Sequence, residues 1–487
     1  MNEAVARTTR ANSERASATG TDDRAAVDER LPLGKTSILG FQHVLVMYAG
    51  VVVVPILIGH ALGLTDRQIA ALVSIDLVLA GIGTVLQALG VWKFGIRMPL
   101  VVGAASQGIV PVVMVGESRG IGTVLGSVLV AGVLWLLLAP FFGTLVRFFP
   151  HVVTGTVILL IGLTLVPVGF RMIAGSDPTA EGYGDLDKLA LAGFTLLLMA
   201  VFYRTLKGFL GQLSILLAIV LATAVGWVID PSTLVSNVGQ APLVGFTAPF
   251  EFGSFVFHVP SIIIFLIIIL VITVEASGQG LAVGEVTGVK VTPQDITRLL
   301  RVDALATTLS SFFFGFIYTT FGQNIGLLKL TGVRSRFPVV AGGIILIMLG
   351  IFQPVGEVMA SIPSPVVGAA AAVTFGVLIL AGMQILAKVD LDKPGNTLIV
   401  MFGVVFGLVP VAAPHFYSQM PDSMNAILHS GVAMGTFVAV VLNLLFSRHT
   451  KEATGFESST GDDTPSADSA DTARTPTSVH TGQDPRT

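Results

Sequence analysis

An acidic side chain follows the most apolar run of this sequence. Glu275 comes directly after IIIFLIIILVITV, and Gln279, four residues later, lies on the same face if the segment is a helix. A charge at the middle of a bilayer costs roughly 2.5–3.5 kcal/mol on insertion scales, so such a residue is a functional candidate by default. A purely structural carboxylate would need a buried cation, and the cores of the apolar segments contain no Lys or Arg. We therefore expect Glu275 to be a functional carboxyl group that can exchange a proton.

A pair of amides interrupts a second apolar region. The stretch TTFGQNIGLLKLTGVRSR, residues 319–336, places Gln323 and Asn324 between glycines and ahead of three basic residues. These amides could simply form hydrogen bonds between helices. A glutamine, however, offers both a donor and an acceptor, which suits a planar heterocycle that carries alternating N–H and C=O groups. We expect the pair to face a binding site.

The composition points to an integral membrane protein. Of the 487 residues 53% are hydrophobic and 12% are charged, whereas charged residues make up about 25% of ordinary soluble domains. The net charge of −3 gives no indication of nucleic-acid binding, and the absence of cysteine excludes disulfides and thiolate metal sites. Residues 1–36 and 449–487 are polar, so we expect two disordered tails around one membrane domain, 37–448.

The apolar segments predict about fourteen membrane spans, each of ~20 residues. Thirteen Lys and Arg residues fall in the loops on one side and four in those on the other. Because positive loops stay in the cytoplasm, we expect both termini to be cytoplasmic.

A faint repeat relates the two halves of the chain. FPHVVTGTVILLIGLTL resembles IPSPVVGAAAAVTFGVLIL when Val152 is aligned with Val366, 214 residues later. Seven spans separate them, so the second half would be inverted, as in many transporters. The third span, GIRMPLVVGAASQGIVP, and the tenth, GFIYTTFGQNIG, are both short and interrupted. We expect these two to be broken elements that form a site at mid-membrane.

Other polar residues in the spans are more ambiguous. His43, in the first span, is either a structural hydrogen-bonding residue or a proton relay. Asp76 is expected near the outer end of the second span, as a wetted or structural carboxylate. Asp303 is expected to open the ninth span, either as a helix-start carboxylate or as a buried polar hub. Tyr48 and Tyr318 are expected to be amphipathic lining.

Several ordered motifs resemble the nucleobase–ascorbate transporters, also called the nucleobase:cation symporter-2 family, over residues 36–448. The motif runs from Gln323 through Gly326 to Thr331-Gly332, and GFQHVLVMYAGVVVVP resembles the family's first span. Glu275, Asp303 and His43 match polar positions of spans eight, nine and one. The resemblance implies an all-α membrane protein of two inverted seven-span repeats, with short strand-like pieces in spans 3 and 10.

The resemblance also implies a division into domains and a mechanism. Spans 1–4 and 8–11, about 37–141 and 260–355, would form a core domain. Spans 5–7 and 12–14, about 150–230 and 364–447, would form a gate domain. A homodimer in the lipid of the cytoplasmic membrane would work by an elevator motion, with a proton as the coupling ion and no cofactor or metal.

The site implied by these motifs holds a nucleobase on Glu275 and Gln323. The residues expected around the base are Ser106, Gln107, Gly322 and Asn324; those expected to couple protons are Glu275, His43 and Asp303; Gln279 and Thr331 would support them. Xanthine and urate permeases of the family carry Gln at position 323 and uracil permeases carry Glu, so we expect xanthine or urate.

Two positions depart from the family pattern. Purine members often have Asp where this chain has Gln279, and many have an aromatic where GAASQG places Ser106 and Gln107. The alternatives are a uracil permease, an anion exchanger or channel of similar fold, and an enzyme. An anion carrier would need a positive site, and no triad, metal cluster or phosphate loop suggests an enzyme.

Overall fold

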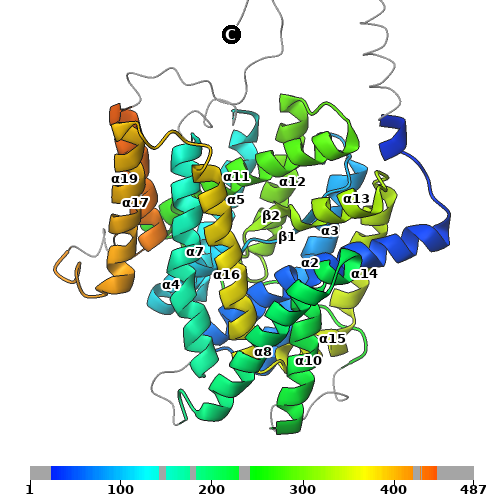
Figure 1. Ribbon diagram of the computed structural model, residues 1–487, viewed down its shortest axis with the longest axis horizontal. Coiled ribbons are helices and arrows are strands. Elements are labelled where there is room, and N and C mark those ends of the chain that lie inside the picture. Colours follow the sequence, from blue (N-terminus) through cyan, green and yellow to red (C-terminus); the bar gives the residue numbers. More distant parts are fainter. Residues whose placement is uncertain are drawn as a thin grey trace, which may run out of the picture. The chain divides into compact units, whose positions relative to one another are not determined.

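A computed structural model of the chain describes residues 24–141, 150–175, 182–229, 242–420, 428 and 430–446, except for the side chain of Ala49 (Figure 1). The described part consists of helices and one two-stranded sheet. The first 23 residues and those after 446, where we expect tails, lie outside the described residues.

The elements follow the chain in an order that places one strand in each half. The helices of the first half are α2 (Leu33–Ala61), α3 (Asp66–Leu89), η1 (Ser106–Gly108), α4 (Ile109–Arg119), α5 (Ile121–Leu138), η2 (Ala139–Phe141), α7 (His151–Ala174), α8 (Leu186–Thr205), α9 (Gly208–Gln212) and α10 (Ser214–Ile229). Those of the second half are α11 (Val259–Thr287), α12 (Pro293–Ser310), α13 (Gln323–Thr331), α14 (Phe337–Ile351), α15 (Gln353–Ala360), α16 (Ser364–Leu386), α17 (Pro394–Ala412) and α19 (Gly431–Phe446). The strands are β1 (Val101–Ala104) and β2 (Tyr318–Phe321).

Eight helices of the described chain are long and apolar enough to cross a membrane, namely α2, α3, α5 with η2, α7, α8, α11, α16 and α17. A ninth span results if α14 and α15, which are bent by 78° where they meet, are counted together. The expected count of about fourteen is therefore not confirmed. Several expected spans fall on shorter elements, since α10 and α19 have 16 residues each and a full span needs ~20.

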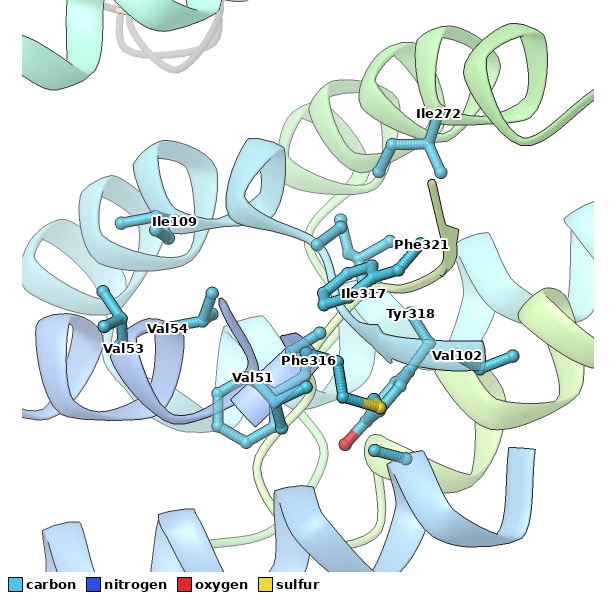
Figure 2. Packing of buried hydrophobic residues seen from close by; sticks show 14 of the residues in the cluster. Val51, Val53, Val54, Val102, Ile109, Ile272, Phe316, Ile317, Tyr318 and Phe321 are labelled. Atoms are coloured by element: carbon cyan, nitrogen blue, oxygen red, sulfur yellow. The ribbon is translucent and has the colours of Figure 1, made fainter. Parts of the chain in front are cut away.

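The two strands lie in the third and tenth expected spans, as the resemblance implies. They pair antiparallel, with Val101 opposite Phe321 and Ala104 opposite Tyr318. All residues of both strands are buried, and apolar side chains of α2, α4 and α11 surround them (Figure 2). A lipid environment tolerates such non-helical backbone only where protein covers it.

Side chains of the neighbouring helices complete the hydrogen bonding of both strands. The backbone N–H of Val102 donates to Thr84 Oγ1 over 2.9 Å, and that of Thr320 donates to Asp303 Oδ2 over 3.1 Å. The N–H of Tyr318 donates to Thr307 Oγ1 over 2.9 Å. Each strand is thus held by its partner strand and by polar side chains of α3 or α12, because the membrane supplies no water for these groups.

A capping box fixes the start of α12. The hydroxyl of Thr292 accepts from the N–H of Asp295, and the Asp295 carboxylate accepts from the N–H of Thr292. Pro293 follows at the first helical position, where its missing N–H costs nothing. Asp303 is consequently the eleventh residue of α12, and the expectation that it opens the helix is wrong.

The segment before α2 is packed against the membrane domain. Val27 is fully buried, and Asp28 Oδ1 accepts a hydrogen bond from Arg336 Nε over 2.6 Å. Arg336 also donates to the carbonyls of Ala88 and Leu89, the last two residues of α3, over 2.8 Å each. Residues 24–32, which we assigned to a disordered tail, are therefore anchored, because the guanidinium joins them to a helix C-terminus that favours positive charge.

Glycines allow α7 and α16 to pack in close contact. Gly162 faces Ile379, and Gly368 faces the backbone of Gly169 and Ile173, so the two helices run antiparallel. These helices carry the two segments that the repeat aligns. A methyl group on Gly382 would collide with the backbone nitrogen of Leu159. The close approach of the backbones thus depends on these positions lacking a side chain.

Replacing Gly382 with Ala is expected to destabilise the protein by about 1–3 kcal/mol, the usual cost of overpacking. The matched control is Gly376→Ala on the same helix, where a methyl group has open space around it. That change should be neutral or stabilising by up to about 1 kcal/mol, because Ala favours the helix. Thermal unfolding midpoints of the purified variants compare the two, and equal midpoints would contradict the packing argument.

Candidate functional site

Helix α11 meets both broken elements. β1 continues into η1 and α4, and β2 continues into α13, so each interrupted span is a strand followed by a short helix. Because the strands are antiparallel, η1 and α13 begin at opposite ends of the two-stranded sheet. Helix α11 packs against η1, β2 and α13, and it carries Glu275 and Gln279. Glu275 and Gln279 therefore lie on a helix that contacts η1, β2 and α13, the elements that carry other residues expected at the site.

Glu275 is bonded to an amide of the third expected span. Gln107 Nε2 donates to Glu275 Oε2 over 2.5 Å, and the Gln107 side chain is 3% exposed. Among the described residues no Lys or Arg forms an ion pair with Glu275. The structure thus brings together two of the expected site residues, and it leaves the carboxyl group without a fixed cation.

Gln279 makes the corresponding contact with the tenth expected span. A methyl group on Gly322 would collide with Gln279 Oε1, so this position accommodates only glycine unless the amide moves. Gln279 lies one turn beyond Glu275, about 6 Å along the helix axis at 1.5 Å per residue. One turn of α11 therefore reaches from η1 to the start of α13, with a carboxyl group at one end and an amide at the other.

The side chains of Gln323 and Asn324 differ in their exposure and contacts. Gln323, the first residue of α13, is exposed. Asn324 is fully buried, and its Nδ2 donates to the backbone oxygen of His43 over 3.2 Å and lies 3.1 Å from His43 Nδ1. The structure therefore joins Asn324 to the first-span histidine, and Gln323 is the amide of the pair that stays accessible.

Asp303 is a buried polar hub. Its carboxylate accepts from the backbone N–H of Thr320 and from Thr320 Oγ1, which lies 3.1 Å from Oδ1. Gln87 Nε2 donates to the same Thr320 hydroxyl over 3.0 Å. Of the two readings of Asp303 that the sequence left open, the structure supports the hub, which fixes β2 between α3 and α12.

Asp76 and Tyr318 form a buried pair that the sequence did not suggest. Asp76 was expected near a wet end of its span, but it is the eleventh residue of α3 and fully buried. The Tyr318 hydroxyl donates to Asp76 Oδ1 over 2.6 Å, and Tyr318 is fully buried as well (Figure 2). Asp76 is therefore a structural carboxylate, one of its two expected roles, but its expected position near a wet end is wrong. The expectation for Tyr318 is wrong as well, because the register of β2 directs this tyrosine towards α3 rather than to an amphipathic surface.

Thr84 and Gln87 are structural residues that sequence reasoning missed. They line one face of α3 together with Asp76, at intervals of eight and three residues. That spacing is a helical stripe of polar residues in an otherwise apolar span, and it could have been recognised. The Val102 N–H donates to Thr84, just as the Thr320 N–H donates to Asp303. In each half of the chain, a polar side chain of a neighbouring helix thus accepts a hydrogen bond from a backbone N–H of the strand.

The remaining expected residues lie at the edges of this arrangement. Ser106 is the first residue of η1 and half-buried. Thr331 is the last residue of α13, and its hydroxyl donates to Leu327 O within that helix over 2.9 Å. Eight residues separate Thr331 from Gln323, about 12 Å along the helix, so its contacts are local.

The polar side chains around Glu275 can form hydrogen bonds with a polar molecule. Within the described ranges no group of three His, Asp or Glu residues could hold a metal ion. A carboxyl group flanked by the amides of Gln107 and Gln279 can instead accept from N–H groups and donate to carbonyls of a polar molecule.

The family of the chain follows from comparison with known proteins. A family model described as "Permease family" matches residues 34–416. The chain belongs to this permease family. Its members are transporters, so the protein is a multi-pass membrane permease and the enzyme alternative is excluded. The resemblance that the Gln323 motif indicated is confirmed.

Two curated relatives of this permease match it over nearly their whole length. A xanthine permease of Bacillus subtilis is 39% identical over 418 residues, which cover 86% of this chain and 95% of the relative. The uric acid permease PucJ of the same organism is 37% identical over 425 residues, 86% of this chain and 94% of the relative.

A solved structure shares the fold at low sequence identity. The transmembrane domain of the cyanobacterial bicarbonate transporter BicA superposes with a TM-score of 0.54 and is 14% identical. The match covers 86% of this permease and 99% of that chain. The likeness shows a membrane-transporter fold, and the permease family assignment comes from the sequence.

Proposed function

We propose that this permease imports an oxidised purine base, xanthine or urate, together with a proton. The observation that carries the proposal is Glu275, a carboxyl group without a fixed cation, bonded to Gln107 beside both broken elements. The relatives named xanthine permease and uric acid permease support the substrate class.

The base is held between the two broken elements. Glu275 accepts from an N–H of the base, and Gln323, which is accessible at the start of α13, bonds a carbonyl. Backbone groups near Ser106, Gly322 and Asn324 add further contacts. Gln279 supports the site through its contact with Gly322, and Thr331 through the end of α13.

Proton coupling is assigned to Glu275, with His43 and Asp303 as the further residues of the pathway. The bond between His43 and Asn324 connects the first span to α13, and the bond between Asp303 and Thr320 connects α12 to β2. A membrane potential contributes about 2.3 kcal/mol per charge per 100 mV, enough for tens-fold accumulation.

The translocation step is an elevator motion of the core domain against the gate domain. In this proposal residues 37–141 and 260–355 move together with the base, and residues 150–230 and 364–447 stay fixed in a homodimer. The permease lies in the cytoplasmic membrane, with both termini in the cytoplasm.

A competition panel tests the substrate class. In cells that express the permease and lack their own purine carriers, unlabelled xanthine and urate should each reduce uptake of labelled xanthine at least tenfold more effectively than uracil. A protonophore should abolish accumulation above the outside concentration. Stronger competition by uracil would favour the uracil alternative, and accumulation that survives the protonophore would point to another coupling ion.

A further inference from the structure

The amide nitrogen of Gln107 donates a hydrogen bond to one of the two carboxylate oxygens of Glu275. The bond from Nε2 to Oε2 measures 2.5 Å and is buried, since Gln107 is 3% exposed. The ionised carboxylate can only accept hydrogen bonds, so in this state the nitrogen of the amide, rather than its oxygen, faces it. The NH2 group carries a second hydrogen, for which no acceptor is found among the described residues.

We propose that Gln107 determines base specificity by changing what Glu275 presents to the substrate. A lone carboxylate presents two acceptors side by side. With Oε2 bonded to Gln107, the pair presents one acceptor, Glu275 Oε1, next to one donor, the second N–H of Gln107. The inference rests on the proposed function, because it assigns a role within the same site.

This acceptor–donor edge selects among purines by their substituent at position 2. Xanthine presents N1–H between two carbonyl groups, so an N–H and a C=O meet the edge together. Position 2 of the base lies towards Gln107 in this proposal, and the C6 carbonyl lies away from it. In this orientation guanine presents N1–H and its 2-amino group, two adjacent donors, which fit a free carboxylate. Gln107 therefore favours 2-oxo over 2-amino bases, and its removal would return Glu275 to a two-acceptor face.

Gln107 also accounts for a departure from the family pattern. The resemblance leads us to expect an aromatic side chain in the third span, and this chain has Ser106 and Gln107 there. An aromatic orients a base by stacking, whereas a bonded amide orients it through its edge. A merely structural Gln107 would only satisfy Glu275, and its loss would weaken all bases by the same factor.

Binding of unlabelled bases to purified protein distinguishes the two roles. In Gln107→Met, which keeps the side-chain length, the dissociation constant for xanthine should rise about tenfold, the effect of one lost hydrogen bond. Hypoxanthine and guanine differ only by the 2-amino group, and the ratio of their dissociation constants should shift about tenfold in favour of guanine. Gln384→Met, at an exposed position of α16, is the matched control and should change neither value.

The outcomes separate this inference from the proposed function. If Gln107→Met changes the dissociation constants of all three bases by the same factor, or changes none of them, the specificity role is overturned. If Gln107→Met does not fold, the same ratios of dissociation constants are measured in Gln107→Ala. A wild-type protein that binds xanthine but does not transport it would overturn only the proposed function, and one that binds none of the bases would overturn both.

Discussion

Uptake of labelled xanthine should fall roughly ten- to hundredfold when Glu275 is replaced by Gln. The estimate reflects a lost hydrogen bond between the base and a charged group, about 1.5–3 kcal/mol. The substituted amide keeps the size of the side chain, and its oxygen can still accept from Gln107, so the local fold should persist. It cannot carry a proton, so accumulation against a gradient should disappear even where some binding remains. Uptake at several external pH values measures both effects.

The control for this experiment lies on the same helix. Glu285 is exposed near the end of α11, and Glu285→Gln should leave uptake within about twofold of wild type, as expected for a surface charge. If Glu275→Gln retains wild-type uptake at every pH, the coupling role of Glu275 is wrong. If it exchanges base without accumulating it, binding and coupling are separate properties of this residue.

Replacing Asp303 with Leu is expected to cost several kcal/mol of stability. The change leaves the N–H of buried Thr320 without an acceptor, and it removes the acceptor of the Thr320 hydroxyl. A buried polar group that loses its partner costs about 1–3 kcal/mol. Because β2 leads directly into Gln323, uptake should be lost together with folded protein. The amount of monodisperse protein after extraction, and its unfolding midpoint, measure the effect.

Asp303→Asn separates anchoring from proton coupling. The asparagine oxygen can accept from the Thr320 N–H, so the folded protein should be recovered in near wild-type amount. If this variant also accumulates xanthine in a proton-dependent way, Asp303 is an anchor alone and its place in the coupling pathway is refuted. A folded variant that binds but does not accumulate would support that place.

The parts of the site that could be predicted from the sequence are those with an intrinsic cost in a membrane. Glu275 in an apolar helix and the glycine-flanked amides are residues that a lipid-facing span does not favour. Their positions can therefore be recognised from the sequence alone. The two interrupted spans were visible for the same reason, and strands β1 and β2 occur there. Such signals depend on residue type and local spacing only.

The partners of these residues could not be predicted, because they are set by packing between distant segments. Asp76 and Tyr318 are 242 residues apart, and the tyrosine reaches the aspartate only through the register of β2 against β1. In the sequence Arg336 is one of several basic residues of an expected cytoplasmic loop. In the structure it donates hydrogen bonds to a carbonyl at the end of α3 and to Asp28. Asn324 follows Gln323 directly, but the turn of α13 directs it to His43.

The pairing of β1 with β2 has a consequence for biosynthesis. Val102 pairs with Thr320, so the ribosome must add roughly 220 residues after β1 before its partner strand exists. At about 5–20 residues per second this interval lasts roughly 10–40 s. During that time the backbone groups of β1 that bond to β2 in the folded protein lack those partners. Thr84 precedes it in the nascent chain, and its hydroxyl can already accept from the Val102 N–H. Of the polar stripe of α3, Thr84 is therefore the residue that offers β1 a hydrogen-bonding partner before the second half of the chain exists.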